Sequence, residues 1–193
     1  MTVTASNFDR KANDFYQTEP WATEALLRNI DVRNRNVWEP AAGNHMIADV
    51  LTESGAKVIT SDIEVYDKQH HYSEPVDFLT SEHIGFPSGL NAIITNPPYG
   101  RGNRAAVKFI EAALERCDGL VAMLLTAKFD FGKTRRHLFA DNPRYQMKIA
   151  LLDRLSLTLD GNTGTEDHAW YVWDRPSTTP AELRYEAKLL DVA

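Results

Sequence analysis

The chain has 193 residues, of which 43% are hydrophobic and 25% are charged, and its formal net charge is −6. This composition is ordinary for a globular domain and does not favour a disordered chain, and no run reaches the ~20 apolar residues that a membrane-spanning helix needs. A single cysteine, Cys117, excludes an internal disulfide framework, and the residues after Met1 lack a secretory signal pattern, so we expect a cytoplasmic protein.

Strand and helix patterns alternate from about residue 36 onward. Short apolar or β-branched runs predict strands, and apolar residues at helical spacing predict helices. The predicted strands are 36–40, 57–62, 90–95, 119–125, 148–153 and 169–174, and the predicted helices are 46–54, 104–116 and 133–140. Repeated strand–helix units indicate a doubly wound, mostly parallel α/β sheet with helices on both faces. The last two strands lack a helix between them, which predicts an antiparallel strand near one edge.

The motif Asn96-Pro97-Pro98-Tyr99 follows a predicted apolar strand. Methylation of an exocyclic amine such as adenine N6 is difficult because the nitrogen lone pair is delocalised into the ring. The Asn96 side-chain oxygen and the Pro97 carbonyl can each accept one N–H and favour the more nucleophilic, tetrahedral nitrogen. Tyr99 offers a flat face on which a planar group can stack. The alternative is a plain turn at the end of a strand.

A second motif precedes the first one along the chain. Glu39-Pro40-Ala41-Ala42-Gly43 is a small-residue turn between the first strand and a helix, and a helix N-terminus favours a carboxylate such as that of S-adenosylmethionine. Asp62 ends the next strand, where an acidic group can accept both hydroxyls of a ribose. Further along, Asp77 and Phe78 can contact an adenine through a carboxylate and a ring.

In the order of these motifs the chain resembles the Rossmann-like S-adenosylmethionine-dependent amino-methyltransferases, especially the N6-adenine group with the NPPY loop, over residues 15–175. The resemblance implies a seven-stranded Rossmann-like sheet and S-adenosylmethionine as cofactor. It also implies that a segment before the first strand closes over the methionine end of this cofactor. The implied catalytic residues are Asn96, Pro97, Pro98 and Tyr99. The implied cofactor-binding residues are Tyr16, Thr18, Pro20, Trp21, Glu39, Pro40, Ala41, Gly43, Asp62, Ile63, Asp77, Phe78 and Asn96.

Substrate contacts are predicted mainly after the catalytic loop. Residues 101–154 hold 11 Lys/Arg against 6 Asp/Glu, whereas the rest of the chain holds 10 against 21. Basic residues interleaved with aromatic ones can hold phosphates and a stacked base, and the alternatives are solvated helix ends and core packing. The candidates are Tyr99, Arg101, Lys128, Phe129, Lys133, Arg135, Arg136 and Trp170. No metal site is predicted.

Two departures from the family pattern bear on function. His45 stands where the cofactor loop usually has its second glycine. The second departure is in domain organisation. We expect a single domain over 1–193, with 1–35 as the cofactor-closing segment and no separate target-recognition domain. A targeting protein or a homo-oligomer would then supply sequence specificity. The predicted function is methylation of adenine N6 in DNA or RNA. The alternatives are a protein glutamine N5-methyltransferase and a non-catalytic module that binds cofactor or nucleic acid.

Overall fold

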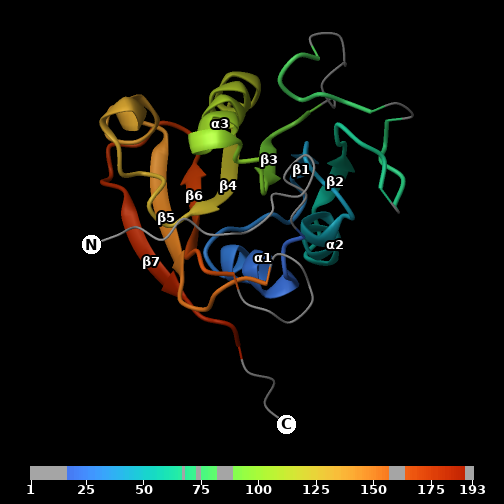
Figure 1. The fold of residues 1–193 in the computed structure, drawn as a ribbon, viewed down its shortest axis with the longest axis horizontal. Coiled ribbons are helices and arrows are strands. Elements are labelled where there is room, and N and C mark those ends of the chain that lie inside the picture. The colour runs from blue at the N-terminus through green and yellow to red at the C-terminus, as the bar shows by residue number, and fades with distance from the viewer. Residues whose placement is uncertain (1–16, 67, 73–74, 82–88, 157–163, 190–193) are drawn as a thin grey trace.

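The computed structural model describes residues 17–66, 68–72, 75–81, 89–156 and 164–189, which form a sheet between two layers of helices (Figure 1). Its strands lie in the order β2-β1-β3-β4-β6-β5-β7. Their bounds are β1 Asn36–Glu39, β2 Lys57–Thr60, β3 Ala92–Thr95, β4 Leu120–Thr126, β5 Tyr145–Leu151, β6 His168–Trp173 and β7 Glu182–Glu186. The predicted seven-stranded Rossmann-like sheet is confirmed.

Most neighbouring strands of the sheet are parallel. β1 pairs parallel with β2 and β3, β3 with β4, and β5 with β7. β6 lies between β4 and β5 and is antiparallel to both, which places the predicted antiparallel strand two positions in from the β7 edge. β7 itself matches none of the predicted strands. It is a short run of alternating polar and apolar residues, most of them exposed, that pairs with β5.

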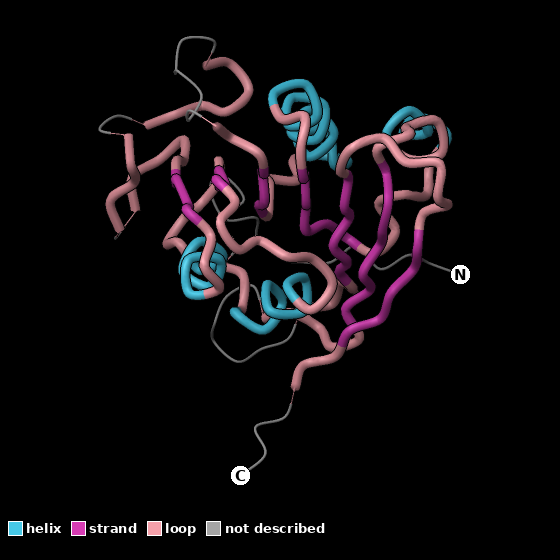
Figure 2. Tube along the Cα trace, turned by 180° about the vertical axis from the view of Figure 1, so that it is seen from behind, coloured by secondary structure: helices cyan, strands magenta, loops and turns pink. Residues whose placement is uncertain are grey.

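Helices cover both faces of this sheet, as Figure 1 and the reverse view in Figure 2 show. α1 (Pro20–Leu27) and α2 (Met46–Glu53) lie on one side, and α3 (Arg104–Arg116) lies on the other. The predicted helices 46–54 and 104–116 are confirmed, whereas 133–140 is a 3₁₀ helix, η3 (Lys133–Leu138). Asn142-Pro143 follows closely, and a residue before proline disfavours helical backbone, so an α-helix has little room there. Among the described residues, no helix is long and apolar enough to cross a membrane.

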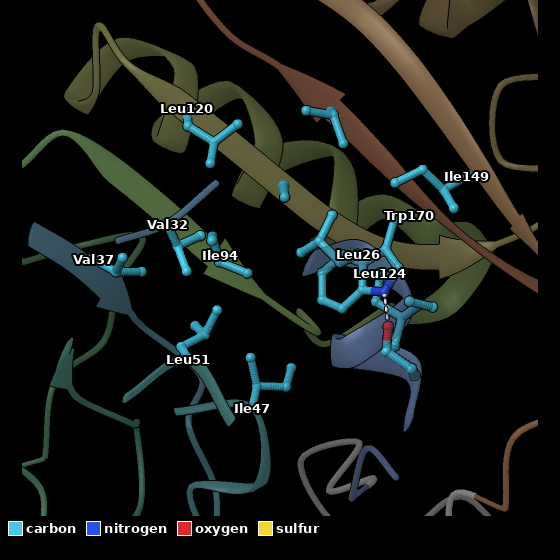
Figure 3. Close-up of a cluster of buried hydrophobic side chains, with 14 of the residues drawn as sticks. Leu26, Val32, Val37, Ile47, Leu51, Ile94, Leu120, Leu124, Ile149 and Trp170 are labelled. Carbon is cyan, nitrogen blue, oxygen red and sulfur yellow. Dashed lines mark hydrogen bonds between the residues drawn. The ribbon is translucent and has the colours of Figure 1, made fainter. Parts of the chain in front are cut away.

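The two faces of the sheet have separate hydrophobic cores. One core packs α1 and α2 against the sheet, and the other packs α3 and η3 against it. Figure 3 shows part of the first core, where Trp170 of β6 reaches α1 and its indole Nε1 donates to the Ala22 carbonyl at 2.7 Å. Trp170 is 0% exposed. The prediction that Trp170 contacts a substrate is therefore wrong: both faces of β6 are covered, and this ring fills the α1 side.

Candidate active site

A cavity of about 230 Å³ lies where β1, β2 and β3 end. In an open α/β sheet, the crevice beyond the carboxyl ends of the strands, at the point where strand order reverses, is the usual ligand site. Here the order reverses at β1, which has β2 on one side and β3 on the other. The predicted cofactor residues that line the cavity are Thr18, Glu39, Pro40, Ala41, Gly43, Asp62, Ile63, Asp77, Phe78 and Asn96.

The loop between β1 and α2 is tied to the end of β2. Gly43 adopts a left-handed φ of 48°, and its N–H donates to the Asp62 carboxylate at 2.9 Å. Burial raises the pKa of Asp62 above its ordinary value of 3.8, and the N–H groups of Gly43 and Glu64 oppose that rise. A carboxylate has about four lone-pair sites, so Asp62 can hold this loop and still accept hydrogen bonds from a ligand.

Glu39 is the most deeply buried acid of the cavity wall. Its Oε2 atom has no hydrogen-bond partner among the described residues. Burial raises the pKa of Glu39 well above 4.5, and the backbone N–H of Ala48 acts in the opposite direction. Because a buried acceptor without a partner is costly, this position favours a ligand that brings hydrogen-bond donors or positive charge to the cavity.

The Asp77-Phe78 segment forms another part of the cavity wall. The Phe78 ring packs edge-on against Trp38 at 5.2 Å between centroids and lies 4.8 Å from the Phe109 ring. The Asp77 carboxylate accepts from the Leu79 N–H at 2.9 Å and thereby closes a turn. Phe78 is 1% exposed, so these contacts make it a closely packed apolar part of the cavity wall, with a carboxylate next to it in the chain.

The catalytic loop meets the same cavity from the end of β3. Asn96 and Pro98 line it, and Nδ2 of Asn96 donates to Oγ1 of Thr18 at 3.1 Å. Pro97 is buried. The Tyr99 hydroxyl donates to the Leu124 carbonyl at 3.3 Å, and its ring lies 6.3 Å from the His168 ring. Tyr99 is thus anchored beside the cavity, outside its lining.

Two predicted cofactor residues, Pro20 and Trp21, are not in the cavity lining. Tyr16 lies outside the described residues. Pro20 takes the first position of α1, where the missing N–H of proline costs nothing, and Trp21 follows it as a buried core side chain. These two residues therefore build the helix that follows Thr18 and do not form the cavity wall.

The predicted substrate residues separate into buried and exposed groups. Phe129 is 1% exposed, and the Arg135 guanidinium lies 4.4 Å from its ring centroid. These two side chains therefore pack against each other in the segment that follows β4. Because Phe129 is buried, the expectation that it stacks on a base is wrong. Phe131, two residues further on, is 71% exposed and is the ring that faces outward. Arg136 pairs with Asp141 at 2.8 Å. Arg136 is exposed, as are the basic candidates Arg101, Lys128 and Lys133.

Several cavity residues were not predicted from the sequence. Tyr66 is the most polar of those that follow β2, and burial together with Asp62 and Glu64 raises its pKa to about 12. The one feature of the sequence that could have pointed to Tyr66 is its position four residues after Asp62. The others are Gln17, Asn44, Met46, Ile47, Val76, Leu79 and Phe109.

His45, the departure in the cofactor loop, is not among the cavity-lining residues. Its backbone is left-handed, with φ of 67°, which explains why glycine would also suit this position. The Nε2 atom of His45 lies 2.9 Å from Nδ1 of His70, so the imidazole joins the loop to the segment after β2. Burial and the neighbouring His70 lower the pKa of His45 from 6.5.

The buried imidazole of His168 predicts a pH-dependent loss of stability. Burial lowers its pKa from 6.5 to about 4, so from pH 6.5 down to 4 the unfolded chain binds a proton that the folded chain does not. The free energy of unfolding should therefore fall over this range, by about 2 kcal/mol between pH 6.5 and 4.5. Urea unfolding at pH 7.5 and 4.5 should show a smaller decrease for His168→Gln than for the unmodified chain. Equal decreases would contradict this prediction.

Solved structures with this fold include proteins named as methyltransferases, as parts of restriction enzymes and as hemolysins. A Pyrococcus horikoshii protein, provisionally named an RNA methyltransferase, is 17% identical with a TM-score of 0.60, and the match covers 82% of each chain. A Listeria monocytogenes protein, provisionally named a class I S-adenosylmethionine-dependent methyltransferase, is 12% identical with a TM-score of 0.58, covering 87% of this chain and 62% of that one. The methyltransferase subunit of a type I restriction-modification system from Streptococcus thermophilus is 13% identical with a TM-score of 0.61, covering 89% of this chain and 46% of that one.

The chain thus spans about half the length of that restriction-modification subunit. No protein-family model and no curated protein sequence matches it. The strand order, the helices on both faces and these matches show that the chain has the Rossmann-like fold of class I methyltransferases.

Proposed function

We propose that the chain is an S-adenosylmethionine-dependent methyltransferase that methylates an exocyclic amino nitrogen, adenine N6 in DNA or RNA. One observation carries this proposal: Asn96 and Pro98 of the NPPY loop line the same cavity as Glu39, Gly43 and Asp62 of the predicted cofactor site. The names of the similar structures support it, since they include an RNA methyltransferase, provisionally named, and the methyltransferase subunit of a restriction-modification system.

The residues of the cavity fit the proposed cofactor. Asp62 can accept from ribose hydroxyls, Phe78 can pack against an adenine, and the buried, unpartnered Glu39 oxygen can accept from the cofactor's donors. Gly43 at positive φ lets the backbone of the loop come close to a ligand. When bound, S-adenosylmethionine supplies an activated methyl group.

The catalytic loop acts on the target amine through fixed acceptors. The Asn96 side-chain oxygen accepts one N–H of the amine, and the Pro97 carbonyl accepts the other. Adjacent proline rings restrict φ at Pro97 and Pro98, which keeps this carbonyl in place. Holding both hydrogens out of the ring plane localises the nitrogen lone pair, and the extra proton leaves to solvent after the methyl group has bonded. The residues act by orientation and preorganised electrostatics.

Exposed groups after the catalytic loop suit a nucleic-acid strand. Arg101, Lys128 and Lys133 can contact phosphates, and the exposed Phe131 ring can stack on a base. We extend the proposal to a targeting protein or a second copy of the chain as the source of sequence specificity.

A methyl-transfer assay tests the proposed function. Tritiated S-adenosylmethionine is offered with unmethylated DNA, ribosomal RNA and a protein extract, and mass spectrometry identifies the methylated product. We expect N6-methyladenine in a nucleic acid. Methylglutamine in protein would instead support a glutamine N5-methyltransferase. Cofactor binding without transfer to any polymer would contradict catalysis and leave a non-catalytic binding module.

The Asp62 carboxylate predicts a cofactor-affinity effect. Asp62→Ala removes acceptors for the ribose hydroxyls and releases the Gly43 N–H, so we expect the dissociation constant of S-adenosylmethionine to rise about 100-fold, or about 3 kcal/mol. Titration calorimetry measures this. Asp141→Ala is the matched control, because that carboxylate pairs with exposed Arg136 outside the cavity. An unchanged affinity in Asp62→Ala would place the cofactor elsewhere.

A further inference from the structure

A buried hydroxyl contacts the proposed catalytic amide. Thr18 is 3% exposed, and its Oγ1 accepts a hydrogen bond from Nδ2 of Asn96 at 3.1 Å. The two residues are 78 positions apart in the sequence, and both line the cavity. The contact therefore joins the segment before α1 to the loop after β3.

The direction of this hydrogen bond determines what Asn96 presents to a substrate. An asparagine amide has one accepting oxygen and one donating nitrogen, and its last torsion has two broad minima that exchange them. An amine to be methylated needs the oxygen. When Thr18 takes the nitrogen, Oδ1 of Asn96 is left to accept from the target N–H.

Thr18 is itself held in place by its neighbours. The carboxylate of Glu19 accepts from the Ser156 N–H at 2.8 Å, and the Trp170 indole donates to Ala22 in the helix that follows. A threonine hydroxyl can donate or accept, and here it accepts from Nδ2 of Asn96, so a core that holds Oγ1 in place also supports the amide orientation in which Oδ1 faces away from Thr18.

We propose that Thr18 is a positioning residue that orients the Asn96 amide with its oxygen toward the target amine. The inference rests on the proposed function and assigns to Thr18 a role in the rate of the reaction, in place of the cofactor contact implied by the family resemblance. The hydroxyl need not touch the substrate, since it acts through Asn96.

Two substitutions separate this role from a cofactor contact. Thr18→Val has nearly the same shape without the hydroxyl, and Thr18→Ser keeps the hydroxyl. We expect Thr18→Val to lower kcat for methyl transfer about tenfold, while the dissociation constant of S-adenosylmethionine changes less than threefold. Thr18→Ser should restore kcat to within threefold of the unmodified chain. Thermal unfolding of each variant checks that the fold is retained.

A readout without turnover completes the test. In the ¹⁵N–¹H spectrum, the side-chain amide signals of Asn96 should shift in Thr18→Val and stay near their original positions in Thr18→Ser. Unchanged kcat in Thr18→Val, or unchanged amide signals, would overturn the inference and leave the proposed function standing. So would a loss of cofactor affinity as large as the loss of kcat, since it would make Thr18 a cofactor ligand. If the unmodified chain methylates no polymer, the proposed function is overturned, and this inference with it.

Discussion

Asn96→Ala should lower kcat for methyl transfer by a factor of about 100 to 1000, the range observed when one preorganised electrostatic partner is removed from a reacting group. Asn96 supplies the side-chain acceptor of the proposed site, and no other residue of the NPPY motif carries a side-chain amide. Its loss leaves the Pro97 carbonyl as a single acceptor, which cannot grip both hydrogens of the amine. The measurement is single-turnover transfer of a labelled methyl group to the polymer identified as substrate.

Gln146→Ala is the matched control for that experiment. Gln146 also carries an amide, which donates to the Arg175 carbonyl at 2.8 Å. It lies near the start of β5, which runs in the same direction as β4. Gln146 is therefore at the amino ends of these strands, and the cavity is at the carboxyl ends. We expect this variant to keep kcat within twofold. Full activity in Asn96→Ala, with its fold intact, would exclude the NPPY loop as the catalytic centre.

The sequence predicted the cavity better than the surface around it. Asp62 and Asn96 each follow an apolar strand, and parallel strands bring their carboxyl ends to one edge of a sheet, so their meeting follows from the strand pattern alone. No such rule predicts which of Phe129 and Phe131 is buried. They are two residues apart after β4, where the strand alternation has ended, and only the packed structure shows which ring is buried.

The helix α1 and the strand β7 were missed for related physical reasons. α1 has eight residues, and its buried side chains cover a broad face that includes the polar Thr23, so the contrast between a buried and an exposed side is weak. Its stability comes from packing on the sheet, which a local pattern does not report. β7 has alternating polar and apolar residues that are nearly all exposed, and it becomes a strand by pairing with β5. In both cases a distant partner decides the local structure.

We expect Trp170 to be a core residue that contributes several kcal/mol to the free energy of unfolding. Trp170→Ala removes a fully buried indole between β6 and α1 and opens a cavity, so the free energy of unfolding should fall by about 3–5 kcal/mol. Trp170→Phe keeps most of the packing and loses the hydrogen bond to the Ala22 carbonyl, which should cost about 1 kcal/mol. Urea unfolding followed by circular dichroism measures both. Tyr185→Ala is the control, because that ring is 62% exposed and its removal should change stability by less than about 0.5 kcal/mol.

The same variants distinguish a core residue from a substrate contact. If Trp170 acts through the packing of α1, Trp170→Phe lowers stability and leaves the KM for the polymer substrate within twofold. Any loss of kcat in Trp170→Phe should then have the same origin as the loss in Thr18→Val, namely the loss of a correctly placed Thr18 hydroxyl. This is because α1 follows Thr18, and the hydrogen bond from Trp170 to Ala22 holds that helix on the sheet. A large rise in KM with unchanged stability would contradict the burial of Trp170 and restore it as a substrate residue.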